Sequence, residues 1–444
     1  MSMVETARPL VHRLTAGAKG QSVVNLGLHL FAAGMGFVAS VLMARLLGDS
    51  GMGVYAFCFA VANVLGVVGR LGLESLVVRE VAQARERQEW GLIHGLVNWS
   101  QIVTLMTSIA VTGALASFGW YWWSTMDRHT SLGLLATVVL VAGITAASLR
   151  AAALRGLHHV IAGQIPSLAV RPVLFVAILV WLLALDFAAP WAVVLAHGIA
   201  HLGAWGVAML LWLRHRPVVR PAVVRSHEWL TSGLPLMLVG GLNLITMQAD
   251  TLMLKTLAGN AATGVYAVAT QLAHATAMAL MVVGSVMAPR FAALYTRGDT
   301  QELQRVVTRS AQATTFATLP LTVSLILLGP LLLRIWGSEF VAGHAALSVL
   351  LLGQAINAFC GNVGQLMIMS GNERELGLVS TFTALLNITL NALLIPTLGM
   401  LGAAIATTTS LATWNLVLAM RVRALLGLHS TLLGSVLSSG RSTR

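Results

Sequence analysis

The sequence predicts an all-α, polytopic membrane protein with about 12 transmembrane helices. Apolar runs of about 20 residues recur along the whole 444-residue chain, and each run is long enough to cross a hydrocarbon core. Hydrophobic residues make up 57% of the chain and charged residues only 9%, whereas soluble domains carry about 25% charged residues. A motif that occurs twice further indicates that the chain consists of two similar halves.

The apolar runs define the expected spans in order. They lie near 23–43, 52–73, 92–117, 131–153, 165–185, 190–213, 232–254, 262–288, 306–329, 344–367, 377–397 and 401–420. The first run follows a basic segment and carries no small-residue cleavage site after it, so we expect a retained helix rather than a cleaved signal. The segment 74–91 has mixed charges and predicts a short interfacial helix.

The repeated motif is the turn between the first two spans of each half. Residues 46–56 (LLGDSGMGVYA) return as residues 257–267 (LAGNAATGVYA), with a constant shift of 211 positions. Both copies start from the same side of the membrane, so the halves are parallel repeats rather than inverted ones. The basic, Pro-containing link 214–229 separates them. We therefore expect an N-terminal lobe at 1–225 and a C-terminal lobe at 226–444.

The basic residues follow the positive-inside pattern of membrane proteins. If the N-terminus is cytoplasmic, 23 of the 27 Lys and Arg residues fall on the cytoplasmic side. This asymmetry predicts that both termini are cytoplasmic. It also explains most of the net charge of +12 as topology, so we do not expect the protein to bind nucleic acid.

Other classes of function receive little support from the sequence. Cys58 and Cys360 fall inside expected spans, and no Cys/His cluster with the spacing of a zinc site occurs. The chain has no P-loop, no HExxH and no GxSxG pattern. A membrane-embedded polysaccharide polymerase or glycosyltransferase would need a long outer loop with polar catalytic residues, but the expected outer loops are short. We therefore expect no catalytic residues.

Several apolar, Gly-rich stretches occur in a characteristic order. They are residues 44–56, Gly72-Leu73, residues 78–82, Asp250, residues 264–266, residues 387–396 (NITLNALLIP), Gly399 and residues 402–407. In this order they resemble bacterial oligosaccharide flippases. These proteins are the polysaccharide-transporter branch of the multidrug/oligosaccharidyl-lipid/polysaccharide exporter superfamily. The resemblance covers nearly the whole chain.

The resemblance implies two six-helix lobes, related as parallel repeats around a central cavity. It implies that the protein moves polyprenyl-pyrophosphate-linked oligosaccharide from the cytoplasmic to the periplasmic leaflet of the bacterial inner (plasma) membrane. The product would serve O-antigen, capsule or exopolysaccharide assembly. The implied partners are this lipid-linked oligosaccharide, membrane lipid, and a polysaccharide polymerase with export machinery. No cofactor is implied, apart from coupling to protons or sodium ions.

Two other functions in the same superfamily remain open. A cation-coupled multidrug antiporter is expected to hold several acidic residues for its cations, whereas this chain has one carboxylate well inside a span and several arginines near the bilayer. A lipid II flippase shares the pyrophosphate-linked cargo, but relatives of that branch usually have two further helices.

A pyrophosphate cargo needs cations, and arginine suits phosphate because its planar fork donates two parallel hydrogen bonds. The candidate cations are Arg70 and Arg171 inside spans, Arg45 and Lys255 at the outer ends of spans, and Arg79, Arg155 and Arg290 at the inner ends. Each has a plainer interpretation as a snorkelling side chain or an anchor of a helix end.

Asp250 is the only carboxylate that we place well inside a span. Because such a residue is costly, it is a functional candidate. It can pair with a cavity arginine, bind a proton or sodium ion, or form a structural ion pair. Four polar residues in spans can contact glycan hydroxyls or other helices: Asn63, Asn243, Gln248 and Asn387. His197 and His201 lie one helical turn apart, where packing is the simplest role.

Overall fold

The computed structural model describes residues 18–121, 127–217 and 221–432, and these residues form helices and short connections without strands. The helices of the first part are α2 (Ala18–Arg70), α3 (Leu73–Glu86), α4 (Trp90–Tyr121), α5 (Arg128–Gly156), α6 (Val160–Ile165), the π-helix η1 (Pro166–Val170), α7 (Arg171–Ala184) and α8 (Pro190–His215). The helices of the second part are α9 (Ser226–Thr296), α10 (Thr300–Leu333), the 3-10 helix η2 (Ser338–Gly343), α11 (His344–Cys360), α12 (Val363–Met369), α13 (Glu373–Leu398) and α14 (Met400–Leu426). The all-α prediction is confirmed.

Among the described residues, ten helices are long and apolar enough to cross a membrane. Two of them, Val24–Arg70 and Thr246–Gly284, have 47 and 39 residues. At 1.5 Å per residue they would extend about 70 Å and about 60 Å, roughly twice a hydrocarbon core. Counting each of these two as a pair of spans gives the expected number of about 12.

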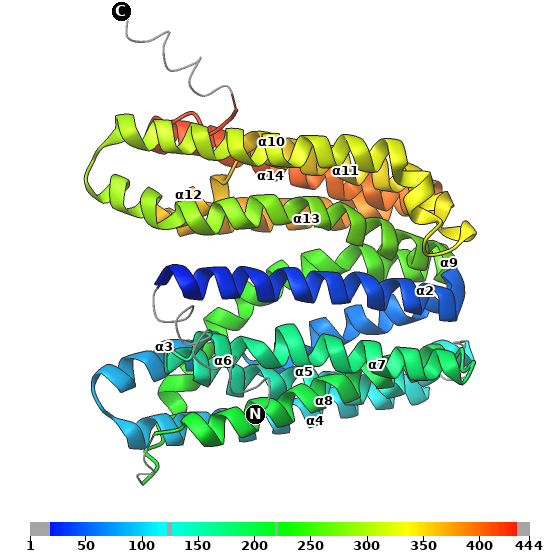
Figure 1. The fold of residues 1–444 in the computed structure, drawn as a ribbon, viewed down its shortest axis with the longest axis horizontal. Helices are drawn as coiled ribbons and strands as arrows, with labels where there is room; N and C mark the ends of the chain where they lie inside the picture. The colour runs from blue at the N-terminus through cyan, green and yellow to red at the C-terminus, as the bar shows by residue number, and fades with distance from the viewer. Residues whose placement is uncertain (1–17, 122–126, 218–220, 433–444) are drawn as a thin grey trace, which may run out of the picture. The chain divides into compact units, whose positions relative to one another are not determined.

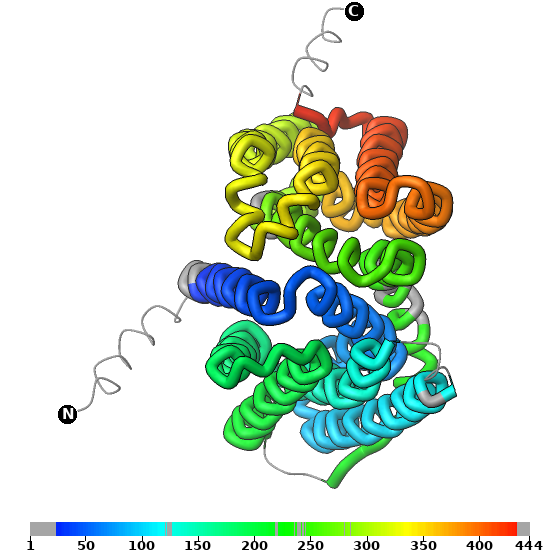
Figure 2. Tube along the Cα trace, turned by 90° about the vertical axis from the view of Figure 1, so that its right-hand side faces the viewer, coloured from blue at the N-terminus to red at the C-terminus, as the bar shows by residue number. Residues whose placement is uncertain are grey.

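Each of the two long helices breaks at the glycine of the repeated motif. Gly48 in α2 and Gly259 in α9 have φ values of 67° and 87°, with ψ near 180° at both. Residues with a side chain rarely adopt this backbone conformation, so glycine is the residue that permits the break. The bend in α2 is visible in the blue part of the tube in Figure 2. The motif is therefore a sharp break between two helices, as expected for a short turn between two spans.

The chain divides into two compact units. Unit 1 consists of Met1–Leu47 and Cys58–Leu244, and unit 2 consists of Gly48–Phe57 and Ile245–Arg444. The residues that follow the Gly48 kink thus belong to the unit that contains the second copy of the motif.

In unit 1, α4, α5, α7 and α8 run side by side (Figure 1), with α5 packed against both α4 and α8. The short helix α3 forms where the mixed-charge segment predicts one. Its apolar face, which includes Leu73, Leu76 and Val81, is buried in a core together with Leu149 of α5 and Trp212 of α8. α3 is amphipathic, and this buried face attaches it to the end of the bundle.

In unit 2, α10, α11, α13 and α14 run side by side. The core at one end of this bundle contains Phe291 of α9, Leu303 of α10, Met367 of α12 and Leu418 of α14. The predicted span 344–367 differs from the structure, because α11 ends at Cys360 and the short helix α12 follows only after Gly361 and Asn362.

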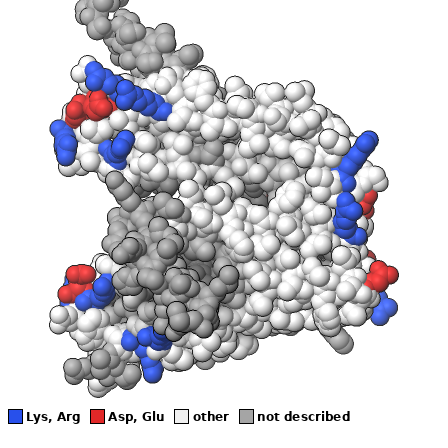
Figure 3. All heavy atoms as spheres, in the orientation of Figure 1, with Lys and Arg blue, Asp and Glu red and all other residues white. Residues whose placement is uncertain are grey.

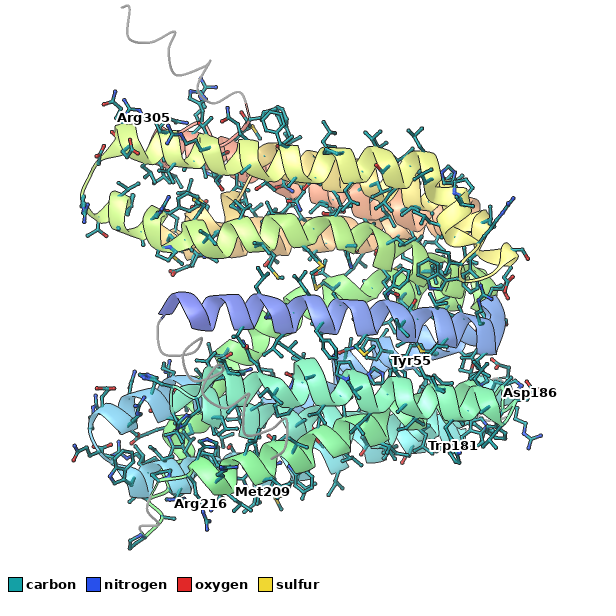
Figure 4. All side chains as sticks on the ribbon, viewed as in Figure 1. Tyr55, Trp181, Asp186, Met209, Arg216 and Arg305 are labelled. Carbon is teal, nitrogen blue, oxygen red and sulfur yellow. The ribbon has the colours of Figure 1, made fainter. Side chains whose placement is uncertain are left out.

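The charged side chains of each unit gather at the ends of its helices. Figure 3 shows Lys, Arg, Asp and Glu at these ends and an uncharged surface between them. In unit 1, Arg216 follows the end of α8, whereas Asp186 follows α7 at the opposite end of the bundle (Figure 4). This distribution leaves a continuous uncharged belt for the hydrocarbon interior.

The two copies of the motif meet inside unit 2. A Cβ atom at Gly53 would lie 1.9 Å from the backbone oxygen of Asn260, and a Cβ at Gly264 would lie 1.9 Å from that of Asp49. The two helix starts therefore touch backbone to backbone, an approach that only glycine allows.

We predict that Gly264→Ala lowers the free energy of unfolding by about 3 kcal/mol, because the added methyl group overlaps a backbone carbonyl that cannot rotate away. The matched control is Gly206→Ala in α8, where a Cβ meets nothing within 4 Å. Because alanine favours a helix over glycine, the control is expected to be neutral or slightly stabilising. Thermal unfolding of the purified protein measures both variants, and equal midpoints would contradict the close contact.

Candidate functional site

The first polar site is a buried carboxylate in unit 2. Asp250 of α9 is 8% exposed. Its Oδ2 accepts a hydrogen bond of 2.9 Å from the Tyr266 hydroxyl, and its Oδ1 accepts one of 2.7 Å from Asn391 Nδ2. The Thr407 hydroxyl also donates to Oδ2. Asn387 of α13 accepts a hydrogen bond of 3.1 Å from Asn391 Nδ2 and so holds this amide in place.

The kink at Gly259 brings Asp250 and Tyr266 together. Both residues belong to α9, and in an unbroken helix 16 residues would separate them by about 24 Å. Because the chain reverses at Gly259, the hydroxyl of Tyr266 reaches the carboxylate directly. The second copy of the motif is thus part of the Asp250 site.

All three donors to Asp250 are neutral. Among the described residues, no Lys, Arg or His side chain forms a salt bridge with this carboxylate. A buried charge is costly without a counter-ion, and charge-assisted hydrogen bonds offset only part of that cost. The arrangement therefore leaves Asp250 able to take up a cation or a proton.

The second polar site is a charge cluster in unit 1. Arg70, at the end of α2, and Arg155, near the end of α5, both bind Glu74 in the first turn of α3, at 3.0 Å and 2.9 Å. Each arginine contacts a different carboxylate oxygen. Arg70 Nε also donates to the Gly66 carbonyl at 3.0 Å, which fixes the orientation of its guanidinium group. The cluster carries one net positive charge.

Four of the other candidate cations have local surroundings of their own. Arg79 pairs with the adjacent Glu80 and is 49% exposed, and Arg290 is exposed near the end of α9. Arg45 is exposed in α2, three residues before Gly48. Lys255 donates to Asn260 Oδ1 across the Gly259 kink and lies 5.9 Å from the ring of Phe57. Lys255 thus stabilises the kink locally.

Arg171 begins α7 directly after the π-helix η1 and is half-buried. Nearby in the same unit, His197 is stacked between the rings of Phe59 and Phe175, with centroid distances of 5.3 Å and 4.2 Å. The ring centroid of His201 lies 5.0 Å from that of His197. The aromatic stacking supports a packing role for His197. Within the described ranges, no group of three or more His, Cys, Asp and Glu residues is placed to hold a metal ion.

The remaining polar candidates have separate positions. Asn63 donates to the carbonyl of Phe59 in its own helix, Gln248 is half-buried, and the side chain of Asn243 lies outside the described residues. Sequence reasoning missed Glu74, Tyr266, Asn391 and Thr407 as members of the two sites. The mixed-charge segment contained a signal for Glu74, and the repeated motif contained one for Tyr266.

Solved structures share this fold across nearly the whole chain. An inward-facing multidrug resistance transporter of the MATE family, from the MOP superfamily, has a TM-score of 0.74 and 15% identity, covering 89% of this chain and 94% of the other. The lipid II flippase MurJ in an inward closed conformation has a TM-score of 0.71 and 14% identity, covering 95% and 94%. A MOP superfamily transporter from Pyrococcus furiosus has a TM-score of 0.60 and 14% identity, covering 94% and 98%. The chain therefore shares the fold of these proteins, and its described part holds ten helices long and apolar enough to cross a membrane.

The chain belongs to the polysaccharide biosynthesis protein family, which matches residues 20–295. The MatE family also matches residues 235–393. No curated protein sequence matches the chain. The family match agrees with the polysaccharide branch that the sequence resembles, and the shared fold is that of MOP superfamily transporters.

We predict that Glu74→Gln lowers the free energy of unfolding by about 1 kcal/mol, because it removes two partly exposed ion pairs and leaves Arg70 and Arg155 facing each other without a counter-ion. The control is Glu80→Gln, which removes the pair with the more exposed Arg79 and is expected to have little effect. Thermal unfolding at low and high salt measures both variants. A loss for Glu74→Gln that does not shrink in high salt would argue against an electrostatic origin.

We predict that Tyr266→Phe lowers the free energy of unfolding by about 2 kcal/mol, since a hydrogen bond to a charged, buried acceptor is lost. Tyr295→Phe, at an exposed position of the same helix, serves as the control and is expected to be neutral. Chemical unfolding of the two variants provides the comparison. Equal stability of both would mean that the Tyr266 hydroxyl does not stabilise a charged Asp250.

Proposed function

We propose that this protein is a flippase that moves polyprenyl-pyrophosphate-linked oligosaccharide from the cytoplasmic to the periplasmic leaflet by alternating access of its two lobes, 1–225 and 226–444. The observation that carries the proposal is the convergence of Arg70 and Arg155 on one carboxylate. Two guanidinium groups that share an anionic partner can also share a pyrophosphate, because both ligands present oxygen pairs to the planar forks. The family membership supports the polysaccharide cargo.

Glu74 then acts as the ligand that the cargo replaces. One carboxylate neutralises only part of the charge of the two arginines, whereas a pyrophosphate carries more negative charge and more acceptor oxygens. Binding of the cargo would release Glu74, and loss of the cargo would restore its ion pairs. In this proposal Arg79, Arg155 and Arg290 attract the phosphates at the cytoplasmic helix ends, while Arg45, Arg171 and Lys255 assist along the path.

Asp250 provides the means of coupling in unit 2. Its three neutral hydrogen-bond donors hold a carboxylate that can bind a proton or a sodium ion without breaking an ion pair. The positive-inside distribution of Lys and Arg supports cytoplasmic termini in the inner membrane. Released glycan would then pass to a polymerase and export machinery on the outer side.

A lipid II flippase is the second candidate, because the fold is similar to that of MurJ over 95% of the chain. Its cargo would use the same arginine cluster. A cation-coupled multidrug antiporter is less well supported, since it would need acidic groups for its substrates and the described part of unit 1 instead presents a cluster with an excess of cations.

We predict that depletion of the protein in its host raises the amount of polyprenyl-pyrophosphate oligosaccharide in the cytoplasmic leaflet and lowers surface polysaccharide. Mass spectrometry of the extracted lipids measures the accumulation and identifies the glycan. Arg70→Ala and Asp250→Asn, expressed at wild-type level, are expected to restore less than a tenth of the surface polysaccharide, because each removes one functional charge. Arg297→Ala, at an exposed arginine just after the end of α9, is the control and should restore most of it.

Three results would contradict the proposal in different ways. An unchanged oligosaccharide pool together with sensitivity to cationic drugs would favour the antiporter. Accumulation of lipid II instead of another glycan lipid would favour the second candidate. Full rescue by both Arg70→Ala and Asp250→Asn would remove these residues from the mechanism.

A further inference from the structure

Unit 2 contains a helix break that the repeated motif does not explain. α11 has 17 residues and ends at Cys360, Gly361 follows with a φ of 72°, and α12 begins at Val363. The candidate membrane span that contains α11 runs from Ser338 to Cys360, so the break follows directly at the end of this span. Irregular backbone at membrane depth is tolerated where it is buried in protein or lines a water-filled cavity.

A cavity lies at this break. Its volume is about 350 Å³, and it is lined by segments of α9, α11, the break itself, α12 and α14, all of which belong to unit 2. The volume falls at the lower end of the range of small-molecule sites, about 300–1,000 Å³. It is therefore large enough for a small ligand and too small for a whole oligosaccharide.

The lining of the cavity is uncharged and mostly apolar, with four polar side chains. Its polar side chains are the amides Asn357, Asn362 and Gln365 and the indole of Trp414, and the other lining residues are apolar or glycine. An amide offers both a donor and an acceptor, which is what a hydroxyl group requires. The indole adds a flat apolar surface with one polar edge. A charged ligand would find no counter-ion among these lining residues.

Three of these side chains are held by hydrogen bonds to neighbouring side chains. Asn357 Nδ2 donates to Gln354 at 3.3 Å, Asn362 Nδ2 donates to Ser310 at 3.1 Å, and Trp414 Nε1 donates to Ser380 at 3.0 Å. These bonds orient the amides and the ring. The side-chain amide of Gln365 forms no hydrogen bond with any described residue. Both its oxygen and its nitrogen are therefore available to a ligand.

Two glycines allow close packing around two of these polar groups. A Cβ atom at Gly284 would lie 2.5 Å from Asn362 Oδ1, and a Cβ atom at Gly364 would lie 2.8 Å from the Trp414 ring. A side chain at either position would press on the amide or on the ring. The absence of side chains at these two positions therefore leaves the Asn362 amide and the Trp414 ring undisplaced.

We propose that this cavity binds one neutral sugar unit of the transported glycan, with its hydroxyl groups on the three amides and a C–H face of the ring on Trp414. The inference rests on the proposed flippase function and adds to it a site for sugar that is separate from the arginine cluster. An uncharged site of this kind binds hydroxyl groups without competing for the pyrophosphate.

The experiment compares two lipids on the same protein, reconstituted in nanodiscs without glycoside detergent. One probe is undecaprenyl pyrophosphate, which has no sugar, and the other is the polyprenyl-pyrophosphate oligosaccharide purified from the host. Native mass spectrometry measures both affinities. We expect Gln365→Leu to weaken binding of the oligosaccharide lipid about tenfold, which corresponds to the loss of one or two hydrogen bonds, and to leave binding of the sugar-free lipid unchanged.

Two further variants make the result interpretable. Gly364→Ala narrows the cavity from the Trp414 side and should weaken binding of the oligosaccharide lipid in the same selective way, even if Gln365→Leu fails to fold. Gln101→Leu makes the same substitution in unit 1, at a glutamine whose Oε1 is buried without a partner, and should change neither affinity.

The possible results separate the inference from the proposed function. If the wild type binds both lipids and neither cavity variant changes the preference between them, the sugar site is wrong and the flippase proposal stands. If a cavity variant weakens both lipids equally, the cavity does not recognise sugar. If the wild type binds neither lipid, the flippase proposal fails, and the sugar site fails with it.

Discussion

The hydrocarbon interior of a membrane contains no water to hydrogen-bond a peptide group, and this constraint governs the structure at every level. It explains why all spanning segments are helices, because a helix satisfies its backbone internally. It also explains why the charged side chains gather at the helix ends of each unit and leave an uncharged belt between them. Where a helix breaks or a polar side chain is buried in the apolar region, neighbouring groups must satisfy the exposed hydrogen-bonding groups. We expect functional sites at such positions.

Three such positions are breaks in helices, and glycine is present at each one. Gly48 and Gly259 create the kinks of the repeated motif, and Gly361 ends α11. Each break has a consequence that an unbroken helix could not produce. The kink at Gly259 brings Tyr266 to Asp250, and the break at Gly361 exposes a set of amides to a cavity. Backbone irregularity and polar side chains thus occur together in unit 2.

Much of this architecture was predictable because it follows from local composition. The apolar runs fixed the number of spans, the motif at 46–56 and 257–267 located the two kinks, and the single intramembrane carboxylate identified Asp250. The partners of these residues were not predictable, because they depend on contacts between distant segments. Asn391 and Thr407 reach Asp250 across 141 and 157 residues of sequence, and Arg155 reaches Glu74 across 81. The break at Gly361 was also missed, since it lies within a mostly apolar run that predicts a single span.

The chemistry of a lipid-linked glycan offers a reason for two kinds of polar site. Its pyrophosphate is strongly charged, and arginine binds it well because the guanidinium group remains cationic even near a membrane. Its sugars carry no such charge, and an arginine placed among them would retain the phosphate instead of the sugar. Amides avoid this competition, because they bind hydroxyl groups through hydrogen bonds of moderate strength that water can replace. A transporter must also release what it binds. Hydrogen bonds of moderate strength would let the sugar leave on the far side. The return of the ion pairs from Glu74 to Arg70 and Arg155 would help to displace the pyrophosphate. In this view Glu74 and the uncharged cavity have complementary roles, since both prevent the cargo from binding too tightly.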